Sequence, residues 1–114
     1  MTTAGPLSIA SHLPRRPESE RLTQYAWDHF QDAFAELRRP VRSIHVTLSE
    51  IVCGGTKILR CSVAVATGLG QPPVYLMHEE RDHREAVRTA ARLALWHTAQ
   101  ALRRQGVRRR PLAS

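Results

Sequence analysis

The chain has 114 residues, 42% of them hydrophobic and 24% charged, and a formal net charge of +7. This length suits one hydrophobic core but not two, and this composition excludes a fully disordered chain. The sequence contains no apolar run of 18 residues and no signal-peptide pattern. We therefore expect a cytoplasmic protein without a membrane partner, with Cys53 and Cys61 as reduced thiols.

The first 17 residues form a segment that is rich in small residues and proline. A short apolar run places Leu7, Ile9 and Leu13 on one face, which predicts an edge strand. Pro14 and Pro17 interrupt regular pairing after this run. We expect a weak first strand within a flexible N-terminal region.

Residues 18–39 show the apolar spacing of a helix, which Pro40 should end. His29 lies within the apolar stripe as a core-edge residue, and Trp27 and Phe34 lie at its border. The stripe consists of Leu22, Tyr25, Ala26, Phe30, Ala33 and Leu37.

Three strands follow this helix. Residues 42–50 alternate between apolar and polar side chains, residues 51–56 read as a hairpin loop, and residues 57–66 form the return strand. A turn at residues 67–73 precedes a short last strand at residues 74–78. The sequence thus predicts an α+β fold of order βαβββα, with an antiparallel four-stranded sheet and two helices on one face.

The last predicted helix spans residues 81–105. Asp82 is its expected N-cap, with Glu85 three residues on, and Gly106 is its expected stop. We place a folded domain at residues 18–105 and a basic flexible tail at residues 106–114. The core-facing stripe of the helix is Val87, Ala90, Ala91, Ala94, Leu95, Thr98, Ala101 and Leu102.

The net charge of the chain lies in its last third, where nine arginines face Asp82 and Glu85. This asymmetry favours a polyanionic partner, although a solvated helix with a basic tail explains it equally well. On the far side of the helix, Trp96 could stack on an unpaired base or cover a core edge. Contacts to roughly five to seven phosphates would give a salt-dependence slope of about four to six. The far side also carries Arg81, Arg88, Arg92 and Arg103.

Catalytic and metal-binding patterns are weak. The histidines and cysteines lack zinc-site spacing, and Gly54 and Gly55 read as turn residues, not as a phosphate loop. Cys53 could act as a nucleophile with His45 or His78 as its base, but the sequence shows no acidic residue that would orient the histidine. We expect no enzyme, metal, cofactor or small-molecule substrate.

Several local strings resemble the bacterial ribosome hibernation factors, the hibernation-promoting factor and ribosome-associated inhibitor family, in their short single-domain form. The resemblance covers residues 18–104. Its carriers are Ser19-Glu20-Arg21-Leu22 with Tyr25, Ile44-His45-Val46-Thr47-Leu48-Ser49-Glu50, Arg60-Cys61, Pro73-Val74 with His78, and Ala86-Val87 with Ala90-Ala91.

This resemblance implies a fold similar to double-stranded RNA-binding domains and a role as a translation inhibitor. Such proteins bind the small ribosomal subunit where messenger RNA and transfer RNA would pass. The positions that match the family's RNA-contacting residues are Arg84, Arg88 and Arg92, with Arg103 and Arg104 beyond them and Arg60 as a less certain contact. The alternatives are a protein-interaction module that kept the fold but not the ribosome, and a generic RNA-binding domain.

Overall fold

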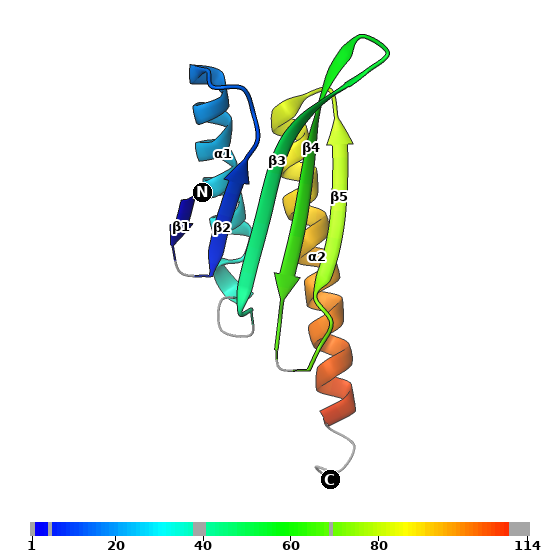
Figure 1. Ribbon diagram of the computed structural model, residues 1–114. Coiled ribbons are helices and arrows are strands. Elements are labelled where there is room, and N and C mark those ends of the chain that lie inside the picture. The colour runs from blue at the N-terminus through cyan, green and yellow to red at the C-terminus, as the bar shows by residue number, and fades with distance from the viewer. Residues whose placement is uncertain (1, 5, 38–40, 69, 110–114) are drawn as a thin grey trace.

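The computed structural model describes residues 2–4, 6–37, 41–68 and 70–109. Both helices pack on one face of a five-stranded sheet (Figure 1). In sheet order the strands are β1 (Thr2–Ala4), β2 (Leu7–Ser11), β3 (Ser43–Cys53), β4 (Thr56–Ala66) and β5 (Val74–Glu80). The helical elements are α1 (Pro17–Ala33), the short 3-10 helix η1 (Ala35–Leu37) and α2 (His83–Arg109). The predicted α+β fold and βαβββα order are confirmed, and β1 is an additional strand.

Strand β2 differs from its prediction as an antiparallel edge strand. It is an inner strand, because β1 pairs with it antiparallel, and it pairs with β3 in parallel, with Ile9 opposite Val46. Strands β2 and β3 can run parallel because the chain between them forms α1, which serves as the crossover connection that parallel neighbours require. Leu7 and Ile9 are buried, so this strand is well packed.

The β3–β4 hairpin is longer than the sequence predicts. Its loop contains only Gly54 and Gly55, whose φ angles of 58° and 81° lie in the left-handed region. Two successive residues with positive φ suit the tight turn that joins twisted antiparallel strands. Cys53 therefore pairs with Thr56 in the ladder, and the hairpin projects beyond the other strands (Figure 1).

Helix α1 covers the β2 and β3 side of the sheet. The rings of Phe30, on the helix, and Phe34, directly after it, stack with their centroids 6.4 Å apart. Both side chains are buried, although Phe34 was predicted at the border of the apolar stripe. His29 lies against Tyr25 at 4.5 Å between ring centroids, at the edge of the core as predicted. The helix ends at Ala33, before the predicted end, because η1 follows it. The predicted stop at Pro40 lies outside the described residues.

Helix α2 covers β4 and β5. Most of its predicted stripe is buried, and Ala86 joins it, whereas Leu95, Ala101 and Leu102 are half-buried. The helix passes through the predicted stop at Gly106 to Arg109, since a helical glycine costs only about 1 kcal/mol relative to alanine. At about 40 Å it is longer than the sheet and overhangs it (Figure 1). Among the described residues, no helix is long and apolar enough to cross a membrane.

Candidate RNA-binding surface

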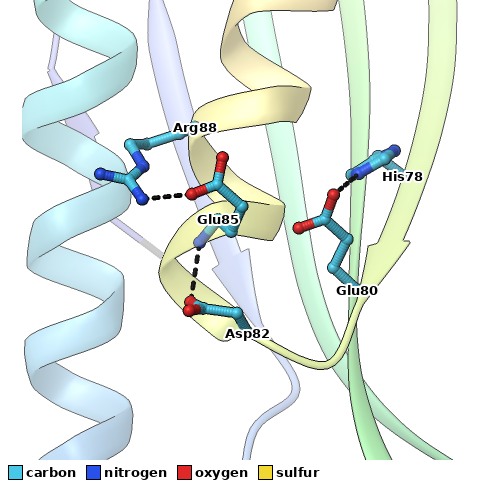
Figure 2. A network of polar contacts seen from close by, with 5 residues as sticks. All are labelled: His78, Glu80, Asp82, Glu85 and Arg88. Atoms are coloured by element: carbon cyan, nitrogen blue, oxygen red, sulfur yellow. Dashed lines mark hydrogen bonds and ion pairs between the residues drawn. The ribbon is translucent and has the colours of Figure 1, made fainter.

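The start of α2 determines which of its side chains face solvent. Oδ1 of Asp82 accepts a hydrogen bond from the Glu85 N–H at 3.0 Å, and its backbone carbonyl accepts one from Ala86 at 2.9 Å (Figure 2). The predicted N-cap is confirmed. The carboxylate of Glu85 contacts Arg88. With this start, the alanine-rich stripe lies against the sheet and the arginines point outward.

Four residues of α2 form a line that we call the cationic row: Arg84, Arg88, Arg92 and Trp96. They are four residues apart, so successive members are about 6 Å apart along the helix axis and the row is about 18 Å long. All four are exposed, Trp96 by 57%. Guanidinium groups bind phosphates through paired hydrogen bonds, and an exposed indole can stack on a base. The row therefore has the chemistry of a single-stranded or looped RNA contact.

The three arginines of the cationic row differ in their contacts. The Arg84 guanidinium lies 5.0 Å from the centre of the Tyr25 ring, which restrains its orientation. Arg88 donates a hydrogen bond to Glu85 (Figure 2), which raises the pKa of Arg88 and offsets part of its positive charge locally. Arg92 forms no ion pair with any described residue. Arg92 is thus the most available cation of the row.

The cationic surface continues along the overhang of α2. Arg103 and Arg104 are exposed, and Arg103 lies about 28 Å from Arg84 along the helix. Arg81, just before the helix, is exposed as well. Apart from Arg81, the predicted cations of this region therefore lie on one continuous helix, spread along its length.

The exposed surface of α1 has the opposite charge. Arg21 is the one arginine within this helix, while its acids are exposed. These acids are Glu18, Glu20, Asp28 and Asp32, followed by Glu36 in η1. The helical side of the domain is thus divided into an acidic helix and a basic one.

Arg60 lies apart from the other predicted contacts. It is on β4, opposite Glu79 of β5, and its side chain points away from the helices. Its Nε lies 2.5 Å from Oε2 of Glu79. The sheet thus lies between Arg60 and the cationic row, and the two are on opposite sides of the domain.

The sequence reasoning missed two neighbouring grooves beside α1. The larger groove, of about 660 Å³, is lined by Arg15, Arg16, Gln24 and Trp27, among others. The smaller groove, of about 260 Å³, also contains Arg16 and reaches Arg84 of the cationic row. The doublet Arg15-Arg16 between two prolines is a sequence signal that would have pointed here. Both grooves also contain acids, Glu20 in the larger one and Glu18 and Glu50 in the smaller one, so their lining is of mixed charge.

The structure does not assemble the cysteine and histidine pairs considered from the sequence. Cys53 is at the tip of the hairpin, and His45 lies eight residues away on the same strand, about 26 Å. His78 is opposite Cys61 and binds Glu80 at 2.8 Å (Figure 2). Burial raises the pKa of Cys61 to about 12, so its thiol is unreactive. Within the described ranges, no group of three or more metal-binding side chains occurs.

These features define a class of protein: a two-layer βαβββα domain with an elongated cationic helix on its outer side. No protein-family model and no curated protein matches the sequence. Among solved structures, the crystal structure of the Thermus thermophilus Protein Y N-terminal domain is similar, with a TM-score of 0.56 and 11% sequence identity. The similarity covers 80% of this chain and 92% of that one. This likeness establishes a common fold.

Proposed function

We propose that this protein is a ribosome-associated translation inhibitor of the hibernation type, acting in the cytoplasm. Its fold is similar to that of a Protein Y domain, and its local sequence strings resemble the ribosome hibernation factors to which Protein Y is related. Its partner would be ribosomal RNA of the small subunit. Bound there, the domain would act as a rigid wedge that excludes messenger RNA and transfer RNA without performing any chemistry.

The observation that carries this proposal is the cationic row. Arg84, Arg88 and Arg92 offer three guanidinium groups at a regular spacing on a rigid helix, and Trp96 extends the line with an aromatic ring. Rigid placement reduces the entropy cost of ordering each side chain on binding. With Arg103 and Arg104, about five phosphate contacts would give a salt-dependence slope with a magnitude of about four.

Co-sedimentation with ribosomes and separated subunits tests the proposal. The protein should travel with the small subunit at low salt and be released as the salt concentration rises. The double variant Arg88→Ala, Arg92→Ala should weaken this binding while its circular dichroism spectrum stays unchanged, because both side chains are exposed. Arg60→Ala removes one positive charge from the opposite face and is the matched control for the single variant Arg92→Ala, which should also weaken binding. Protein that stays at the top of the gradient at both salt concentrations would refute the proposal.

Two alternatives predict different results in the same experiment. A generic RNA-binding domain would bind bulk RNA as tightly as the small subunit. A protein-interaction module is favoured by the side of the sheet that carries Tyr75 and Met77, which are 74% and 56% exposed. Raised salt would weaken the binding of a protein partner by such a module far less than it weakens RNA binding.

A further inference from the structure

The face of the sheet opposite the helices, here called the open face, is poor in charge. Figure 1 shows this face uncovered, with both helices behind the strands. Among the described strand positions that point to it, the residues with full charges are Arg60 and Glu79, and these two pair with each other. Solvated sheet faces commonly carry scattered charges, whereas charge depletion with exposed Tyr and Met is typical of the centre of a protein interface.

The open face is also uneven in height. Tyr75 and Met77 form a ridge on β5, the edge strand of the sheet. Beside them on β4, Ala64 is the direct cross-strand neighbour of Tyr75, and Ser62 is that of Met77. Both side chains are small, so the surface of β4 is lower here than the ridge. On the far side, β2 presents Ser8 and Ala10, which are small as well. Between β2 and β4, β3 presents Thr47 and the exposed His45, whose ring is hydrogen-bonded to Ser8 at 2.7 Å. The face therefore consists of one large-residue ridge on β5 beside a shelf that is low on β2 and β4 and is interrupted by His45 on β3.

We propose that the open face binds the open face of a second copy of this chain. A two-fold axis parallel to the strands would place β5 of each copy over β2 of its partner, so that each ridge fits onto the other shelf. The paired charges Arg60 and Glu79 sum to zero, so the two faces do not repel each other. The basic helices of the two copies would face outward, where their repulsion is smallest.

The size of the open face sets the expected strength of this dimer. Strands β2 to β5 are about 19 Å wide in total, and β5 is about 24 Å long, which gives about 450 Å² in projection. Because a pleated surface exceeds its projection, two copies would bury about 1,000 Å², the lower limit for a specific interface. We therefore expect a reversible dimer with a dissociation constant in the micromolar range. This inference does not depend on the proposed RNA binding.

Sedimentation analysis of nuclease-treated protein at 0.5 M salt, between 5 and 200 µM, tests the dimer without RNA bridging. The wild-type protein should show a monomer–dimer equilibrium. The double variant Tyr75→Lys, Met77→Lys should raise the dissociation constant at least about 30-fold, as expected for the loss of a central apolar contact. Tyr75→Ser with Met77→Ser provides a second pair without added charge, and circular dichroism checks folding of both.

Val52→Lys is the matched control. Val52 is 70% exposed but lies near the hairpin tip, outside the ridge, so this variant should dimerise as the wild type does. A wild-type protein that remains monomeric at 200 µM would overturn the inference. So would a dimer that neither ridge variant weakens. Loss of ribosome binding in the cationic-row variants, with dimerisation intact, would separate the two proposals.

Discussion

Replacing Arg92 by Ala should weaken RNA binding more than replacing Arg88 by Ala. Arg92 has no ion-pair partner among the described residues, whereas Arg88 is already bound to Glu85. One phosphate contact contributes about 0.7 (single strand) to 0.9 (duplex) to the magnitude of the slope of log affinity against log salt, which corresponds to about five- to eightfold at 0.1 M salt relative to 1 M. We expect about that loss for Arg92→Ala. For Arg88→Ala we expect about two- to threefold, because RNA must compete with Glu85 for this guanidinium.

Fluorescence anisotropy with small-subunit ribosomal RNA, between 0.05 and 0.3 M salt, measures both the affinity and the slope. The variant Glu85→Gln should raise the affinity, because it releases Arg88 and removes a negative charge from the row. All three substitutions are at the surface and should change the free energy of unfolding by less than about 0.5 kcal/mol. Equal losses for the two arginine variants, or no gain for Glu85→Gln, would refute the role of this ion pair.

Three further predictions concern stability. The hydroxyl of Thr98 is buried without a hydrogen-bond partner among the described residues, so Thr98→Val should raise the free energy of unfolding by about 1 kcal/mol in urea titrations, whereas Thr98→Ala should lower it. Asp82→Ala should cost about 1 kcal/mol through loss of the α2 N-cap, measured in the same way. Because burial raises the pKa of Cys61 from 9.0 to about 12, the unfolded thiol ionises first, and stability should fall by about 1.4 kcal/mol per pH unit between these values. Cys61→Val should remove this component, and Cys53→Ser should retain it.

The sequence predicted the elements whose hydrophobic period is strong. The alternation in β3 and β4 and the alanine stripe of α2 correspond to buried faces in the structure. The errors in these elements lie at their ends, where local signals compete. The Gly54-Gly55 pair marked a turn, but only the ladder between Cys53 and Thr56 shows that the turn is limited to these two residues. Gly106 resembled a helix stop, yet the residues around it continue the helix.

The direction and neighbours of strand β2 show what a hydrophobic period alone cannot predict. The apolar residues Leu7 and Ile9 indicated a strand, but its direction and neighbours depend on the α1 crossover and on β1, which are tertiary features. In the candidate site, the i, i+4 spacing correctly predicted an exposed cationic row. The alternation in β4 likewise placed Arg60 on the face opposite the buried Leu59 and Cys61, as the structure confirms. It did not predict that Glu79 on β5 would pair with Arg60, because that contact depends on the β4–β5 register.

The charge difference between the two helices limits how RNA could bind. Packed helices are about 8–10 Å apart, so phosphates lying across both helices would come within a Debye length of the α1 acids such as Asp28 and Asp32. Repulsion there would offset much of the attraction by α2. An RNA backbone that follows the axis of α2 avoids these acids and meets the arginines in succession. The acids of α1 would then contribute orientation more than affinity, by disfavouring every path except the one along α2.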